Sequence, residues 1–173
     1  LKNITFEEVL MYSSNVGMAK IGEKIGKERL YKYFQRFNFG AYTGIDLPAE
    51  AVGILPNILT WYDISPYILA FGQGIGTTSI QMINAFSAVA NKGIMMEPRV
   101  VKGIEDDGVV SENKSRVMRR ILSEKVCKEL LGAMYLVTEK GTGLDARIRG
   151  YKVGGKTGTA QKIDTNINQY SES

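Results

Sequence analysis

The sequence predicts a mixed fold, α/β of the α+β kind, that is mostly helical with a small hairpin and one further strand. Apolar residues recur at helical spacing in five segments between residues 4 and 140. The period changes to that of strands at residues 97–121, and residues 148–162 are predicted to be extended. A chain of 173 residues is long enough for one domain with a sizeable core.

The composition narrows the classes of function. The net charge is only +4 and no basic stripe is interleaved with aromatic residues, so we expect no nucleic-acid partner. Histidine is absent, which excludes triads with a histidine base and argues against a zinc site. We therefore expect neither a metal nor a cofactor. Cys127 is the single cysteine, and its place on the apolar side of a helix predicts a buried, inert thiol.

The first two predicted helices meet at a polar junction. Thr5 and Glu8 have the spacing of a capping box at the start of a helix over residues 4–12. Apolar residues at positions 18, 21 and 25 predict a second helix that ends at Gly26. Ser13-Ser14-Asn15 lie between these two segments. Serine and asparagine side chains compete for backbone hydrogen bonds and favour caps and turns, so we expect a junction between two helices here.

The middle of the chain alternates helices with loops. A third helix is predicted over residues 27–37, followed by a long loop over residues 40–66 that is rich in glycine and proline. A loop of this length often forms a wall of a binding cleft. Thr78 and Gln81 form a second capping box, and Gly93 ends the helix that they begin. The glycines at 72, 74 and 76 only faintly match a dinucleotide fingerprint.

The last third contains a hairpin and a long helix. Asp107-Gly108 lies between an apolar set at positions 100, 101 and 104 and another at positions 109 and 110, which predicts a tight hairpin turn. A helix is expected from Ser123 to about Lys140. The stretch over residues 154–161 then brings together one cation, Lys156, with hydroxyls and glycine backbone amides that favour an anion.

Two interpretations fit this stretch. Gly150, Gly155, Lys156 and Thr157 formally satisfy the phosphate-loop pattern, but that loop must open a helix, and Gly158 makes a helix a poor prediction. The alternative is a strand with Lys156-Thr157-Gly158 that binds a carboxylate and an oxyanion. A Ser-x-Asn element followed by K-T-G, in this chain order, belongs to the motif set of penicillin-binding proteins.

On these motifs the chain resembles a class B penicillin-binding protein, a peptidoglycan D,D-transpeptidase. The resemblance covers about residues 4–162, and it includes residues 13–18, 43–48, 72–75, 90–93 and 154–161. It implies a β-lactamase/transpeptidase-like fold, stem peptides ending in D-Ala-D-Ala as substrates, and β-lactam antibiotics as ligands. It also implies a location on the outer face of the bacterial cytoplasmic membrane, with the anchoring segment outside this chain.

The resemblance also implies roles for individual residues. Ser13 would belong to the proton-transfer network, Asn15 would bind a substrate amide, and Lys156 would supply positive potential and support proton transfer. Thr157, Gly158 and Thr159 would bind substrate, with the two hydroxyls holding its carboxylate and the Thr159 N–H acting as an oxyanion donor.

One element of the motif set is missing. The nucleophilic serine of S-x-x-K stands upstream of Ser-x-Asn in this family, and nothing before Ser13 contains it. Ser111 and Lys114 have the right spacing, but they lie in a polar stretch after the hairpin. We therefore interpret residues 1–173 as a partial transpeptidase domain, without the S-x-x-K region and the strands after K-T-G. Alone it is expected to be inactive, with the unpaired strand either pairing with another copy or staying disordered.

Related functions remain open on these motifs. A D,D-carboxypeptidase or β-lactamase-like serine hydrolase, and a non-catalytic β-lactam sensor domain, would share the same residues.

Overall fold

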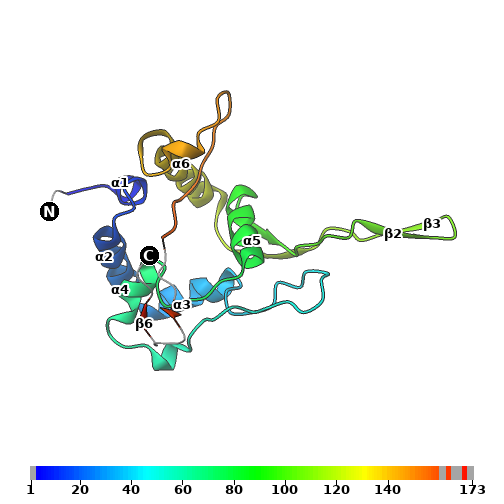
Figure 1. The fold of residues 1–173 in the computed structure, drawn as a ribbon, viewed down its shortest axis with the longest axis horizontal. Coiled ribbons are helices and arrows are strands. Elements are labelled where there is room, and N and C mark those ends of the chain that lie inside the picture. The colour runs from blue at the N-terminus through cyan, green and yellow to red at the C-terminus, as the bar shows by residue number, and fades with distance from the viewer. Residues whose placement is uncertain (1–2, 160–162, 165–168, 171–173) are drawn as a thin grey trace.

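The computed structural model describes residues 3–159, 163–164 and 169–170 (Figure 1). The expected continuation of the extended segment through residues 160–162 lies outside the described residues. The α-helices are α1 Phe6–Met11, α2 Asn15–Ile25, α3 Lys27–Arg36, α4 Ser65–Ala70, α5 Ser79–Ala90 and α6 Glu124–Lys140. The short 3-10 helices are η1 Ile58–Thr60 and η2 Leu144–Ala146. The strands are β1 Ile94–Met96, β2 Gly103–Asp106, β3 Val109–Glu112, β4 Val117–Arg120, β5 Ile163–Asp164 and β6 Gln169–Tyr170.

Local signals place the helix ends as the sequence predicts. The Thr5 backbone N–H donates to Glu8 Oε2 at 2.8 Å, and the Glu8 N–H donates back to Thr5 Oγ1 at 3.3 Å. The same reciprocal box joins Thr78 and Gln81 at the start of α5. These bonds satisfy amides that would otherwise have no partner in the first turn of the helix. The mixed, mostly helical fold is confirmed.

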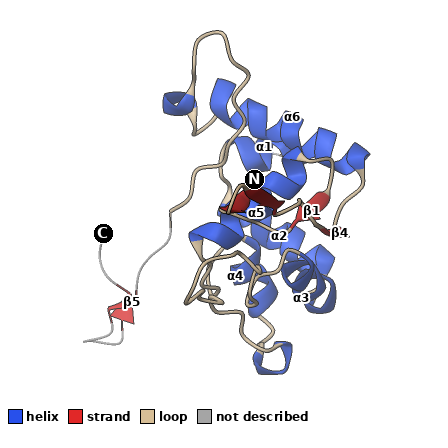
Figure 2. Ribbon diagram, turned by 90° about the vertical axis from the view of Figure 1, so that its right-hand side faces the viewer, coloured by secondary structure: helices blue, strands red, loops and turns tan. Residues whose placement is uncertain are grey.

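The helices pack in pairs, chiefly α2 with α4 and α1 with α6, and α5 packs against a small β element. Figure 2 shows α1 and α6 at the top of the molecule, α3 and α4 below, and α5 with β1 between them. β1 pairs with β4 in an antiparallel sheet, and a core cluster of Ala88, Met95 and Ile121 fills the space against α5. Gly93 turns the chain from α5 into β1 with φ of 84°, where a Cβ would lie 2.1 Å from the Leu122 carbonyl oxygen. Only glycine fits this turn.

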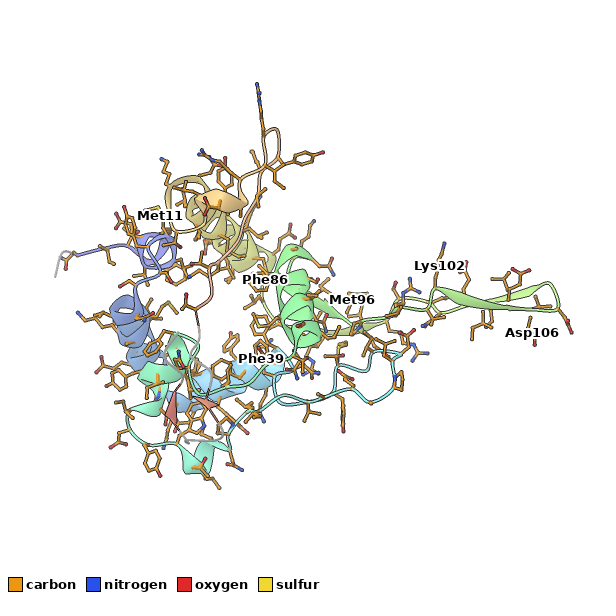
Figure 3. The ribbon with its side chains drawn as sticks, in the orientation of Figure 1. Met11, Phe39, Phe86, Met96, Lys102 and Asp106 are labelled. Carbon is orange, nitrogen blue, oxygen red and sulfur yellow. The ribbon has the colours of Figure 1, made fainter. Side chains whose placement is uncertain are left out.

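The predicted hairpin is confirmed and projects away from the helices (Figure 1). Asp107 and Gly108 both have positive φ, 47° and 76°, as a two-residue hairpin turn requires. Lys102 and Asp106 lie along this projecting arm in Figure 3. The hairpin therefore takes no part in the contacts between helices.

The long loop after α3 is fixed by polar side chains. The buried Gln81 amide donates to the carbonyl oxygens of Ala41 and Val52 at 2.9 and 2.8 Å. Asp46 accepts the backbone N–H groups of Val100 and Val101 at 2.7 and 2.9 Å, which joins the loop to the base of the hairpin. Helix α4 at the end of this loop differs from the prediction. It has only six residues and, unlike the equally short α1 with its capping box, no side chain caps its first turn.

The K-T-G segment differs from its prediction. Lys156-Thr157-Gly158 form no strand pairing among the described residues; β5 and β6 pair only with each other. The segment is held along α6 instead. The Gly155 N–H donates to the Met134 carbonyl oxygen at 3.2 Å, and the Thr138 hydroxyl donates to the Val153 carbonyl oxygen. A strand is defined by the ladder to its neighbour, and here a helix supplies the contacts.

Candidate functional site

The turn between α1 and α2 presents the Ser13 hydroxyl. Ser14 is the N-cap of α2, and its hydroxyl accepts the Gly17 N–H at 3.1 Å. Ser13 precedes it with φ of 53°, a left-handed conformation, and its N–H donates to the Leu10 carbonyl oxygen at 3.2 Å. The cap thus uses the Ser14 hydroxyl and leaves that of Ser13 for the site.

Lys156 reaches this turn from the other end of the chain. Its ammonium donates to Ser13 Oγ at 2.7 Å, to the Thr157 carbonyl oxygen at 2.7 Å and to Thr157 Oγ1 at 3.3 Å. Among the described residues no carboxylate forms an ion pair with this ammonium. Burial lowers the pKa of Lys156 below its usual value. A cation held by neutral oxygens keeps its attraction for an incoming anion.

The end of α6 and the turn after it hold the K-T-G segment through hydrogen bonds. Thr138 is fully buried in α6, and its hydroxyl reaches across to the Val153 carbonyl oxygen. After α6 the Thr142 hydroxyl lies 2.8 Å from the Thr157 hydroxyl, and the Thr142 N–H donates to the Met11 carbonyl oxygen at 3.1 Å. The same turn therefore contacts both the α1 end of the junction and the K-T-G segment.

The other candidate residues are close in sequence to this contact but are exposed. Asn15 is the first residue of α2 and is exposed. Gly158 and Thr159 are also exposed, and no described atom lies within 4 Å of the position that a Gly158 Cβ would take. The structure thus brings Ser13, Lys156 and Thr157 together and leaves Asn15, Gly158 and Thr159 exposed.

An apolar cavity adjoins the lysine. Its volume is about 370 Å³, and among the residues that the structure describes Lys156 is the one charged residue in its lining. The lining is otherwise apolar and aromatic, with contributions from α1, α3, α5 and α6; Phe39 and Phe86, which Figure 3 labels, are two of its residues. Leu10, three residues before Ser13, lines the same cavity. The hydroxyl and the ammonium thus sit at the rim of a large hydrophobic space.

Two other candidate residues lie away from this contact, and the phosphate-loop interpretation is not supported. Ser111 is exposed in β3, opposite Ile104 on the projecting hairpin, so it does not share a helix turn with Lys114. Cys127 is buried and free, and burial raises the pKa of its thiol. No helix follows Lys156 within the described residues, so the phosphate-loop interpretation lacks the helix N-terminus that it needs.

Comparison with known proteins shows the family of this chain. The family model described as the penicillin binding protein transpeptidase domain matches residues 1–173. This chain belongs to that family. The class B assignment and the transpeptidase-like fold expected from the sequence are confirmed.

Similar proteins of this transpeptidase family come from several bacteria. Stage V sporulation protein D of Bacillus subtilis is 40% identical over 92% of this chain and 25% of its own length. Penicillin-binding protein PbpB of Mycolicibacterium smegmatis is 36% identical over 88% of this chain and 25% of its own length. The chain thus spans about a quarter of the length of these curated relatives.

Solved structures of transpeptidase relatives superpose closely. Penicillin binding protein 3 of Mycobacterium tuberculosis, complexed with aztreonam, has a TM-score of 0.91 and 32% identity over 97% of this chain and 39% of that one. Penicillin Binding Protein 2X of Streptococcus thermophilus has a TM-score of 0.88 and 30% identity over 98% of this chain and 26% of that one.

Sequence reasoning missed two residues that support the K-T-G segment. Thr138 and Thr142 are isolated threonines near the end of a long helix, and no short motif marks them. Their importance lies in contacts to residues 15 positions further along the chain. Only the return of the chain alongside α6 makes these contacts visible.

Proposed function

We propose that this chain is part of a peptidoglycan D,D-transpeptidase that crosslinks cell-wall stem peptides through a serine acyl-enzyme. The observation that carries the proposal is the hydrogen bond from Lys156 Nζ to Ser13 Oγ, 2.7 Å long. It joins the Ser-x-Asn element to the K-T-G element, which are 143 residues apart in sequence. A proton can pass along this pair without any histidine.

The proposed reaction forms and breaks one ester. A serine hydroxyl attacks the carbonyl carbon of the penultimate D-alanine, and the amide bond to the terminal D-alanine breaks. The leaving nitrogen takes a proton and departs with free D-alanine. An acceptor amine of a second stem peptide then attacks the ester carbonyl, the bond to the serine oxygen breaks as the crosslink forms, and one proton of the acceptor amine passes to the serine oxygen.

The residues of this chain would bind and orient the donor peptide. Asn15, exposed at the start of α2, would hydrogen-bond a backbone amide of the substrate. Thr157 and Thr159 would hold the terminal carboxylate through their hydroxyls, beside the Lys156 ammonium. Gly158 leaves the backbone open to the ligand, and the Thr159 N–H would donate to the oxyanion that forms in the transition state.

The nucleophile would come from a part of the protein other than the described residues. We propose an S-x-x-K serine on a helix from a preceding segment, seated over the apolar cavity beside Ser13 and Lys156. The cavity supports this because a helix with an apolar face could fill it and carry a serine to its polar rim. Ser111, on the exposed hairpin, offers neither the helix turn nor the proximity.

The ligands and the location follow from the same proposal. β-Lactams would acylate the same serine. This proposal is supported by a relative that has been crystallised both in complex with aztreonam and in complex with ampicillin. The donor would be a stem peptide ending in D-Ala-D-Ala. The protein would act outside the cytoplasmic membrane, anchored by a segment outside this chain; none of the helices described here is long and apolar enough to cross a membrane. The K-T-G segment would pair with a strand of another copy when this chain is isolated.

The test uses the full-length protein that contains this chain. Fluorescent penicillin should label it, and purified stem peptides ending in D-Ala-D-Ala should become crosslinked when an acceptor amine is present. The chain of residues 1–173 alone should remain unlabelled. Release of D-alanine without crosslinks would point to a carboxypeptidase, and labelling without turnover of peptide would point to a sensor. Either result would overturn the proposal.

A further inference from the structure

We propose that Thr142 is a positioning residue that turns the hydroxyl proton of Thr157 toward the carboxylate of the substrate. The inference rests on the proposed function, because it concerns how the K-T-G segment binds the end of the donor peptide. Thr142 belongs to none of the motifs above. It is placed by the turn that follows α6.

The backbone of Thr142 is fixed before any ligand binds. Its N–H donates to the Met11 carbonyl oxygen at 3.1 Å. The preceding Gly141 is pressed against α1, since a Cβ there would lie 2.3 Å from the same Met11 oxygen. The following Gly143 donates its N–H to the Val137 carbonyl oxygen at 3.0 Å. Hydrogen bonds on both sides therefore hold this turn between α1 and α6.

The Thr142 hydroxyl meets the Thr157 hydroxyl at 2.8 Å, a normal distance for two hydroxyls. The geometry allows either oxygen to donate. The Lys156 ammonium, 3.3 Å away, can only donate to Thr157 Oγ1. The Thr157 hydroxyl thus has one proton to donate, and its oxygen can accept hydrogen bonds from both Thr142 and Lys156.

A bound carboxylate decides the direction of this bond. A carboxylate only accepts hydrogen bonds, so Thr157 must donate its single proton to it. The Thr142 hydroxyl must then donate to Thr157 Oγ1, alongside Lys156. In this arrangement the Thr142 hydroxyl proton is accepted by Thr157 Oγ1, and the Thr157 hydroxyl proton is accepted by the carboxylate of the ligand. Without the Thr142 donor, the Thr157 hydroxyl rotates more freely and orders only on binding, which weakens the complex.

The turn also links the carboxylate site to the proton-transfer pair. Thr142 contacts Met11 through its backbone and Thr157 through its side chain, and Lys156 joins Thr157 to Ser13. Met11 and Ser13 are two residues apart, so these contacts close a ring. The ring holds the K-T-G segment at a fixed distance from the α1–α2 junction.

The experiment compares Thr142→Val with Thr142→Ser in the full-length protein. Valine keeps the shape of threonine but removes the hydroxyl, whereas serine keeps the hydroxyl. The probes are a thioester analogue of D-alanyl-D-alanine with a free carboxylate and its methyl ester. We expect Thr142→Val to lower kcat/KM for the free acid by about fivefold, the effect of one neutral hydrogen bond, mainly through KM. The methyl ester should change by less than about twofold, and Thr142→Ser should restore the acid.

A purely structural role would give a different pattern. A distorted turn would slow the acid and the ester alike, and serine would not restore selectivity; that result overturns the proposal. In a Thr157→Val background, Thr142→Val should have no further effect on the acid, and an additive loss would also contradict it. Wild-type protein that reacts with neither probe would overturn the proposed function itself. Normal wild-type reaction with an unchanged acid-to-ester ratio in Thr142→Val would overturn only the inference on Thr142.

Discussion

Lys156 Nζ donates a hydrogen bond of 2.7 Å to Ser13 Oγ, although the two residues are 143 positions apart. The ammonium has no carboxylate partner among the described residues, and its other acceptors are the carbonyl and hydroxyl oxygens of Thr157. The pair therefore combines a proton path with an uncompensated positive charge. Both properties are useful for attack on a peptide that ends in a carboxylate.

Replacing Lys156 with alanine in the full-length protein should lower the second-order rate of acylation by benzylpenicillin by about 10²–10³, the usual cost of one preorganised donor. Lys152→Ala is the matched control, since Lys152 is exposed and lies four positions earlier. Ser111→Ala should also react at a nearly normal rate. The assignment of the motifs fails if Ser111→Ala and Lys156→Ala lose activity equally.

The dependence on pH should report the charge of Lys156. Burial lowers its pKa below the ordinary 10.5, so the ammonium loses its proton before an exposed lysine would. Affinity for a carboxylate-bearing β-lactam should therefore decline as pH rises through a value below 10.5. Lys156→Arg, which stays charged, should remove this decline at the cost of a slower reaction. Measuring acylation rates for both proteins across the alkaline range tests this, and an identical decline in the arginine variant would contradict it.

The lowered pKa of Lys156 also makes stability depend on pH, but here the stability rises with pH whereas the affinity for the ligand falls. Because the folded-state pKa is depressed, the unfolded chain binds more protons between that pKa and 10.5. The free energy of unfolding contributed by Lys156 should therefore rise as pH increases through this window. Urea unfolding of the wild type and of Lys156→Met at several alkaline pH values measures it. A difference between the two proteins that stays constant with pH would show that burial does not penalise the charge.

The predictable part of this fold is its local part. The capping boxes at Thr5 and Thr78, and the Asp107-Gly108 turn, depend on residues a few positions apart, so sequence spacing reveals them. Helix α4 was not predicted, because it has only six residues and no side chain caps its first turn. The contact between Ser13 and Lys156 was suggested only by the family resemblance. The spacing of residues 143 positions apart carries no distance information.

The Glu50 carboxylate should contribute an acid-dependent part of the stability. It accepts the Thr43 N–H at 2.7 Å, the Thr43 hydroxyl at 2.6 Å and the Gly44 N–H at 3.2 Å. Burial by itself raises the pKa of Glu50, but these hydrogen bonds outweigh it and lower the pKa below 4.5. The stabilisation is therefore present above 4.5 and is lost as pH falls through the lower folded-state value.

The measurement is the free energy of unfolding between neutral pH and about pH 3, for the wild type and Glu50→Gln, because carboxylates protonate in this range. The glutamine variant should be less stable at neutral pH, and its stability should fall less steeply on acidification. Glu105→Gln, the same change on the exposed β2 strand, is the control for removing one glutamate charge. Parallel curves for the wild type and Glu50→Gln would contradict the role of these bonds.

Two helical glycines should respond to alanine in opposite ways. A Cβ at Gly22 in α2 would lie 2.4 Å from the Pro66 carbonyl oxygen and 2.6 Å from the Ala70 Cβ, both in α4. Gly22→Ala should therefore push the two helices apart and destabilise the fold by about 1–3 kcal/mol, the usual cost of overpacking. Gly132 lies inside α6 with no atom within 4 Å of the same position. Gly132→Ala should stabilise the protein by about 0.5–1 kcal/mol, because alanine favours the helix more than glycine does.

Urea unfolding of the two variants, with the midpoint and the slope fitted separately, distinguishes these effects. A shift of the midpoint at constant slope reports stability rather than a change in the surface exposed on unfolding. If Gly22→Ala were as stable as Gly132→Ala, helix propensity alone would govern both sites. The close approach of α2 to α4 would then be too loose to hold the α1–α2 junction, and with it Ser13, in a fixed position.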